Sequence, residues 1–355
     1  MKKIYIIVTL SYFFSLLALA QIPSGYYDNA AGLEGQALKV ALHDIIDDHQ
    51  SMTYSNIYNI LDQTDKKPNG KVWDMYSDVP GGTPPYEYTF FTDACGNYSG
   101  EGSCYNREHS WPKSWFGGTK YPMYTDLFHI VPTDGYTNGK RSNYPFGEVG
   151  NASWTSQNGS KVGGNTFPGY NGTVFEPIDE YKGDFARGYF YMSTRYYNED
   201  NSWPGSDAVN GAELKEWTKN LLLSWHYADP LSQKEIDRCN AIYDLQNNRN
   251  PFIDHPTWVS KIWDPENALE EISISEIMNI YPRDNGNLLF LDALDNNNQI
   301  GYHLQIFNIS GQKIWEGNMN ESHFEINLNS TQKGCYILQL TNMNNQLAYH
   351  FKFIR

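Results

Sequence analysis

The chain reads Tyr-Asn-Arg-Glu-His-Ser-Trp-Pro from Tyr105 to Pro112, and this stretch carries its densest cluster of reactive side chains. A histidine such as His109, with an ordinary pKa of about 6.5, can accept a proton from water at neutral pH. Glu108 offers a carboxylate oxygen, and Asn138 offers an amide oxygen further along the chain. Because Mg²⁺ is commonly held by one or two such ligands with waters and substrate phosphate, the pattern indicates a general base beside a hard-metal site.

Basic residues near this stretch supply donors suited to phosphate, namely Arg107, Lys140 and Arg141. Together with a base and hard-metal ligands they describe a metal-assisted phosphodiesterase. Glu108 and His109 are neighbours, so in a regular strand their side chains would point to opposite faces. Both can serve one site only at a strand end or an irregularity, and Pro112 favours an end nearby.

Each of these residues also has a plainer interpretation. A single histidine is more often a surface or structural residue, and Asn138-Gly139 is typical of a turn. Asp126 fits a helix cap as well as a metal ligand, and Arg187 and Arg195 fit the solvated face of a helix. The cluster as a whole, rather than any one residue, favours catalysis.

Composition limits the classes of function that remain. With 355 residues, 40% of them hydrophobic and only 19% charged, the chain is long and apolar enough for about two folded domains. Its formal net charge of −15 excludes a protein that coats nucleic acid by bulk attraction. Any phosphate-binding surface must therefore be a local patch, with binding that depends markedly on salt.

The first twenty residues are typical of a secretory signal peptide. Lys2 and Lys3 precede an apolar run from Ile4 to Leu17, and Ala18-Leu19-Ala20 offers small residues for cleavage. An anchoring helix is the alternative interpretation. No later stretch is long and apolar enough to span a bilayer, so we expect an exported mature protein without a membrane span.

Export permits disulfides, and Cys95 and Cys104 are the natural pair because the glycines between them let the chain double back. A loop this short would stabilise the fold by roughly 2 to 3 kcal/mol when closed. Cys239 and Cys335 fall in different predicted domains, and their pairing stays open.

Periodicity predicts helices over residues 30–49, 185–196, 212–225 and 232–246, the last opened by the capping pattern Ser232 to Glu235. Short strands are expected at 72–76 and 86–91, and a long surface loop at 151–171. From residue 269 onward, β-type runs separated by turns predict a small all-β sandwich.

Four ordered blocks of the chain closely resemble the endonuclease I family of exported nonspecific nucleases. They are YNREHSWPKSWFGG from residue 105, DLFHIVPTDGYTNGKRSNYPFGEV from 126, FEPIDEYKGDFARGYFYMSTRYY from 175 and LLLSWHYADPLSQKEIDRCNAIYDLQNNRNPFIDHP from 221. The resemblance implies an α+β fold with a ββα-metal (His-Me finger) site in residues 21–268. It also implies cleavage of DNA, often of RNA as well, to products with 5′-phosphate ends.

By this resemblance His109 is the general base, and Glu108 and Asn138 hold one Mg²⁺, with Mn²⁺ or Ca²⁺ as alternatives. The scissile phosphate would be gripped by an arginine, for which Arg107, Arg141 and Arg187 are candidates, with Lys140 as a further phosphate contact. Phe128 departs from the family, which usually has His there, and removes a polar group near the site.

Residues 269–355 resemble the type A sorting domain of the type IX secretion system of Bacteroidetes. The motifs that carry the resemblance are Asn279-Ile280-Tyr281-Pro282, the run at 306–311, Gly334-Cys335-Tyr336 and the terminal Lys352-Phe353-Ile354-Arg355. The expected partner is therefore the type IX machinery, and the expected location is outside the cell or on its surface, reached through the periplasm. A sandwich that binds glycans or DNA is the alternative.

The leading hypothesis is a monomeric, secreted, Mg²⁺-dependent nonspecific endonuclease that acts on DNA, with RNA left open as a second substrate. The alternative is a secreted adhesion or nucleic-acid-binding protein on a catalytically silent nuclease scaffold. A metallopeptidase is a third hypothesis, but the chain has no HExxH motif.

Overall fold

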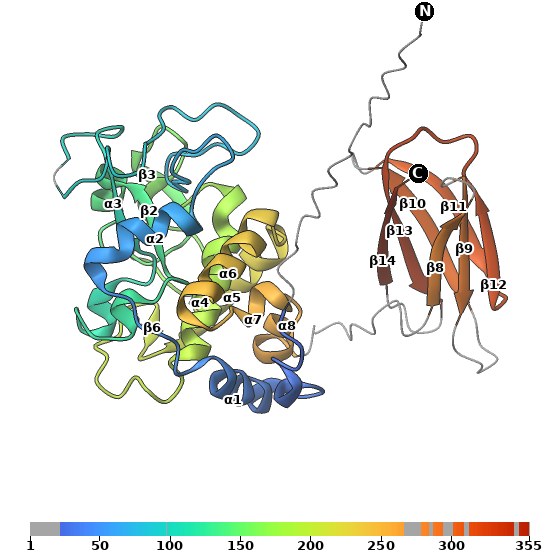
Figure 1. Cartoon of the computed structure of the whole chain (residues 1–355), viewed down its shortest axis with the longest axis horizontal. Coiled ribbons are helices and arrows are strands. Elements are labelled where there is room, and N and C mark those ends of the chain that lie inside the picture. Colours follow the sequence, from blue (N-terminus) through green and yellow to red (C-terminus); the bar gives the residue numbers. More distant parts are fainter. Residues whose placement is uncertain are drawn as a thin grey trace, which may run out of the picture. The chain divides into compact units, whose positions relative to one another are not determined.

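The computed structural model describes residues 22–96, 98–265, 278–283, 287–293, 301–308, 312–343 and 348–354. The chain divides into two compact units, Met1–Glu266 and Asn267–Arg355 (Figure 1). The signal peptide expected at residues 1–20 lies outside the described residues. None of the helices in the described part of the chain combines the length and apolar character needed to cross a membrane.

Helices make up much of the first unit. They are α1 (Gly35–Ile46), α2 (Ile57–Thr64), α3 (Gly135–Arg141), α4 (Lys182–Arg195), α5 (Glu216–Ala228), α6 (Gln233–Gln246), α7 (Pro251–Asp254) and α8 (Trp258–Trp263). The four helices expected from periodicity are present as α1, α4, α5 and α6. Helix α6 begins with the predicted capping box, because Ser232 Oγ accepts from the Glu235 N–H and the Glu235 carboxylate accepts from the Ser232 N–H.

The strands of the first unit form small antiparallel sheets. They are β1 (Tyr105–His109) with β2 (Ile130–Asp134), then β3 (Val149–Thr155), β4 (Lys161–Asn165) and β5 (Thr173–Glu176), and β6 (Val209–Asn210) with β7 (Glu213–Leu214). The register of the first pair runs from Tyr105 opposite Asp134 to His109 opposite Ile130. Helix α3 follows β2 at once. Figure 1 shows α3, β2 and β3 on one side of this unit and α4 to α8 on the other.

Three local predictions are wrong. Residues 151–171 hold most of β3 and all of β4, not a long loop. Backbone pairing forms these strands although many of their side chains are small, polar and exposed. Residues 72–76 and 86–91 form no named strand, although the Val72 N–H donates to the Tyr88 carbonyl. Tyr76 and Tyr88 are buried. The aromatic residues that suggested strands therefore belong to irregular segments that pack into the core.

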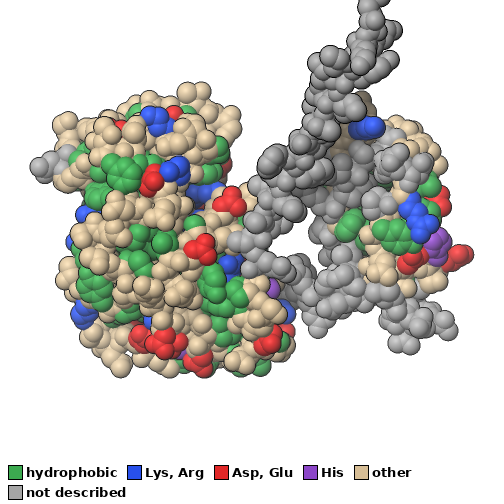
Figure 2. Space-filling model, in the orientation of Figure 1, with side chains coloured by type: hydrophobic (Ala, Val, Ile, Leu, Met, Phe, Trp, Pro, Cys, Tyr) green, Lys and Arg blue, Asp and Glu red, His purple; other side chains and the backbone are tan. Residues whose placement is uncertain are grey.

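Aromatic side chains dominate the core of the first unit. Its largest fully buried groups include Trp111, Tyr76, Tyr105, Tyr189 and Phe146. A disulfide joins Cys95 to Cys104 just before β1, whereas Cys239 is a free, buried residue of α6. The side chain of Cys335 lies outside the described part of the structure. Figure 2 shows basic and acidic side chains interspersed over the face in view, with no single basic surface there.

The second unit has two antiparallel sheets. One has the strand order β11 (Lys313–Met319), β10 (Tyr302–Asn308), β13 (Cys335–Asn342), β14 (Ala348–Ile354), and the other β12 (His323–Asn327), β9 (Leu288–Ala293), β8 (Met278–Arg283). Alternate residues from both sheets, such as Leu289, Leu304 and Leu338, share one core. The small all-β sandwich expected from residue 269 onward is thus present.

Candidate active site

A cleft of about 390 Å³ lies where β1 ends, and Glu108, His109 and Asn138 all line it. His109 is the last residue of β1, where the strand geometry that would send neighbouring side chains to opposite faces stops applying. Asn138 comes from α3, which follows the partner strand β2. The strand end thus resolves the geometric conflict between Glu108 and His109 in the sequence.

Glu108 is a buried carboxylate with two side-chain partners. Arg141 Nη1 lies 2.9 Å from Glu108 Oε1, and the Tyr76 hydroxyl donates to the same oxygen over 3.1 Å. Burial raises the pKa of Glu108 to about 7, although the Arg141 guanidinium works in the opposite direction. A cation in the cleft would favour the ionised form, and both side-chain partners leave Oε2 to other ligands.

His109 is held in one orientation by its surroundings. Its Nε2 lies 3.1 Å from the Tyr124 carbonyl oxygen, and its ring stacks on the Tyr124 ring at 5.3 Å between centroids. Because a carbonyl can only accept, Nε2 carries the proton and Nδ1 keeps its lone pair. Burial, and then the nearby His129, lowers the pKa of His109 to about 3, so the imidazole is neutral at pH 7. The ring is therefore neutral, and Nδ1 is the nitrogen at which it can accept a proton.

Asn138 presents its amide oxygen as a free acceptor. Its Nδ2 donates to Asn106 Oδ1 over 2.7 Å, so this contact uses the amide nitrogen and not the amide oxygen. The helix that carries it is started by Asp134, whose carboxylate accepts from the Thr137 N–H over 2.6 Å. A Cβ at Gly139 would lie 2.2 Å from the Tyr98 hydroxyl oxygen, so any other residue here would require the Tyr98 ring to move.

These donors fit a hard divalent cation. Glu108 supplies a carboxylate oxygen and Asn138 an amide oxygen to one cleft, which is the ligand chemistry of Mg²⁺ with open positions for water and phosphate. Among the described residues there is no group of three or more His, Cys, Asp or Glu side chains placed to hold a metal. A zinc-type site of nitrogen and sulfur ligands is thus not found in the described chain.

The predicted phosphate contacts have different surroundings. Arg107 lines the cleft, stacks 3.9 Å from the Tyr54 ring centre, and has a buried Nε with no hydrogen-bond partner in the structure. Arg141 also lines it but is only 1% exposed, and it donates to the backbone carbonyls of His109 and Ser110 as well as pairing with Glu108. Lys140 lies over the Tyr136 ring and does not line the cleft.

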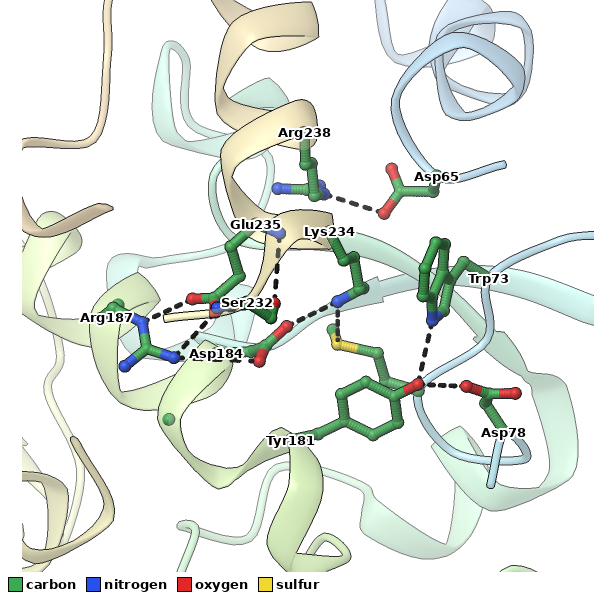
Figure 3. A network of polar contacts seen from close by, with 12 residues as sticks. Asp65, Trp73, Asp78, Tyr181, Asp184, Arg187, Ser232, Lys234, Glu235 and Arg238 are labelled. Carbon is green, nitrogen blue, oxygen red and sulfur yellow. Dashed lines mark hydrogen bonds and ion pairs between the residues drawn. The ribbon is translucent and has the colours of Figure 1, made fainter. Parts of the chain in front are cut away.

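Arg187 lies outside the cleft, within a buried network of charged groups (Figure 3). Its guanidinium forms two bonds to the Glu235 carboxylate, of 2.5 and 2.9 Å, and a third to the Asp229 carbonyl. The interpretation of Arg187 and Arg195 as a solvated helix face is wrong, because both are buried. Arg187 fastens α4 to α6 and has no donor directed at the cleft.

His226 contacts this network and gives it a testable pH dependence. Its Nδ1 lies 3.4 Å from Arg187 Nη1, and burial, followed by that cation, lowers the pKa of His226 to about 4. The unfolded chain, with a histidine pKa of about 6.5, then binds the proton more readily than the folded chain. The stability due to neutral His226 is therefore complete above about pH 6.5 and is lost as the pH falls towards about 4.

Between about pH 6.5 and pH 4, we expect the free energy of unfolding of His226→Gln to fall by up to about 3 kcal/mol less than that of wild type. The free energy of unfolding by denaturant would be measured at several pH values between about 4 and 7, for wild type and variant. The neighbouring carboxylates of Asp229 and Glu235, whose pKa values burial raises, titrate in both proteins and cancel in the comparison. Parallel pH curves for the two proteins would show that His226 does not contribute.

Asp126 is neither a helix N-cap nor a cleft residue. It is fully buried, and its carboxylate accepts from the Tyr191 hydroxyl, the Tyr196 hydroxyl and Gln246 Nε2 over 2.8 to 3.1 Å. Phe128, where the family usually has a histidine, packs against the Tyr191 ring at 4.6 Å. This region supports the fold beneath the site.

Sequence reasoning did not find several residues of the cleft. Tyr54, Lys113, Ser114 and Asn143 also line it, and Tyr54 comes from a one-turn helix far earlier in the chain. Lys113 lies close to His109 in the sequence, and this closeness was the signal that could have placed it in the cleft. The position of Tyr54 depends on tertiary packing, which its local sequence does not reveal.

Residues 34–257 match the family described as Endonuclease I, and this match spans more than half of the chain. The chain belongs to the endonuclease I family. Residues 279–354 match the family described as secretion system C-terminal sorting domain. This endonuclease I family chain is therefore a secreted or cell-surface nuclease with a sorting domain at its C-terminal end.

Relatives of this endonuclease I family chain are named for nuclease activity. It is 37% identical over 254 residues to an extracellular ribonuclease of Bacillus amyloliquefaciens, which is 67% of this chain and 78% of that protein. The extracellular ribonuclease of Bacillus subtilis is 36% identical over 248 residues, with the same two coverages. Endonuclease-1 of Buchnera aphidicola subsp. Baizongia pistaciae is 29% identical over 132 residues, which is 36% of this chain and 46% of that protein.

Proposed function

We propose that this secreted nuclease is a metal-dependent, nonspecific endonuclease that hydrolyses phosphodiester bonds of DNA and RNA to products with 5′-phosphates. The observation that carries the proposal is the meeting of Glu108, His109 and Asn138 in one cleft at the end of β1. The order of β1, β2 and α3 agrees with the ββα-metal architecture that the resemblance implies. The two relatives named extracellular ribonuclease support RNA as a substrate beside DNA.

In this proposal His109 acts as the general base. Its Nδ1 takes a proton from a water, and the resulting hydroxide oxygen bonds to phosphorus. The bond from phosphorus to the 3′ oxygen breaks, and that oxygen takes a proton from solvent to become the 3′-hydroxyl. The imidazolium then returns its proton to solvent. The Tyr124 carbonyl, by holding Nε2–H, keeps the ring in the tautomer that this step requires.

Glu108 and Asn138 would hold Mg²⁺, which would stabilise negative charge on the scissile phosphate and on the departing oxygen. Arg141 fixes the Glu108 carboxylate and the backbone at the end of β1, so we assign it a positioning role. Arg107 lines the cleft and is partly exposed, unlike the buried Arg141, so it is the best placed phosphate contact.

The test is metal removal. We expect the purified mature protein to cut plasmid DNA and a long RNA in Mg²⁺, to lose this activity in excess EDTA, and to recover it when Mg²⁺ exceeds the chelator. Mn²⁺ and Ca²⁺ would be compared in the same assay, read by gel electrophoresis. Cutting that continues unchanged in EDTA would contradict the metal site, and absence of cutting with every metal would favour the silent binding scaffold.

A further inference from the structure

A second cleft, of about 570 Å³, adjoins the candidate active site. The two clefts share Ser114 and Asn143 as lining residues, so they form one continuous track on the surface of the first unit. A nucleic-acid strand whose scissile phosphate lies at His109 must place its neighbouring nucleotides along such a track. The second cleft is large enough for the base and sugar of one nucleotide.

The two clefts differ in charge. The first is lined by Arg107, Lys113 and Arg141. Among the described residues that line the second there is no Lys, Arg or His, and its one charged group is Asp207. Because these lining residues offer a phosphate no favourable charge interaction, the cleft suits the uncharged parts of a nucleotide.

Aromatic rings give the second cleft the faces that a base needs. Tyr144 is 37% exposed. Tyr170 stacks on Trp217 with ring centroids 4.8 Å apart and planes within 16°, and its hydroxyl donates to Asp207 over 3.1 Å. A ring braced in this way loses little freedom when a base stacks on it, and such stacking tolerates any base.

We propose that the second cleft binds the base and sugar of a nucleotide beside the scissile phosphate, with Tyr144 and Tyr170 as stacking faces. This inference rests on the proposed function and extends it to substrate class. A base must leave its duplex stack to enter, so the protein should cut single-stranded segments in preference to intact duplex. Asn143 and Asp207 offer hydrogen bonds to sugar hydroxyls and base edges without selecting one sequence.

The test uses an end-labelled single-stranded DNA in which one nucleotide is replaced by an abasic residue. With wild type and Mg²⁺, we expect cleavage to drop by roughly tenfold at one bond, at a fixed position relative to the abasic residue. Moving the abasic residue along the strand should move the drop with it. In Tyr144→Ala the drop should shrink markedly, and in Tyr144→Phe, which keeps the ring, it should remain.

Tyr227→Ala serves as a matched control, because Tyr227 is also an exposed tyrosine but lines neither cleft. Uniform cleavage by wild type across the abasic position, or a drop that Tyr144→Ala leaves unchanged, would overturn the inference alone. If wild type cuts no substrate at all, the proposed function fails and this inference fails with it.

Discussion

Replacing His109 by alanine is expected to lower the rate of phosphodiester hydrolysis by roughly 10²- to 10⁴-fold, because the variant has no group to take the proton from water. The buried imidazole is neutral, and its Nε2 is bonded to the Tyr124 carbonyl, so Nδ1 is its available lone pair. The rate would be measured under single-turnover conditions with a fluorescent oligonucleotide and saturating Mg²⁺. This separates the chemical step from binding.

His323→Ala is the control for that comparison, since His323 lies on an exposed strand of the second unit. We expect it to hydrolyse substrate at the wild-type rate. Binding of a non-cleavable phosphorothioate oligonucleotide by His109→Ala should remain, which would show that the cleft is intact. Equal rates for His109→Ala and wild type would remove His109 from the mechanism.

Replacing Asp126 by alanine is expected to destabilise the first unit by about 3 to 5 kcal/mol, because several buried donors would be left without an acceptor at about 1 to 3 kcal/mol each. The Tyr191 hydroxyl from α4, the hydroxyl of Tyr196 just after α4 and the Gln246 amide from α6 would lose their common acceptor. Denaturant unfolding, monitored by the near-ultraviolet signal of the buried aromatic rings, would measure the change. Metal dependence of the remaining folded protein should be unaltered, because Asp126 does not line the cleft.

Asp179→Asn provides the contrast. The Asp179 side chain is 88% exposed and pairs with Lys182 one turn later, so its loss should change stability by less than about 1 kcal/mol. If Asp126→Ala were equally mild and instead weakened the response to Mg²⁺, Asp126 would have to be regarded as a metal ligand.

Much of the fold could be predicted where one physical signal dominates. The helical spacing of α4 and the Ser232 to Glu235 capping pattern of α6 predicted both helices. Short β-type runs separated by turns predicted the sandwich. The sheet of β3 and β4 was missed because its strands expose Asn, Ser and Gly side chains, which are typical of loops. In that sheet, backbone pairing with β5 outweighs local preference.

The candidate site was predictable in composition but not in the roles of its arginines. The sequence does not reveal which elements pack against the helix that carries Arg187. Its ion pair with Glu235 in the folded chain shows that Arg187 has a structural role. Asn138-Gly139 likewise has the composition of a turn, yet it lies inside α3. In the structure, the Tyr98 ring occupies the space next to Gly139 that a side chain would enter.

Separate cores have a consequence for the life of this protein after export. In the described residues, the first core and its packed neighbours extend to Trp263, and the second begins at Met278. A protease that cuts the chain between the two cores would remove the sorting domain, and every side chain of the first core would remain in the nuclease unit.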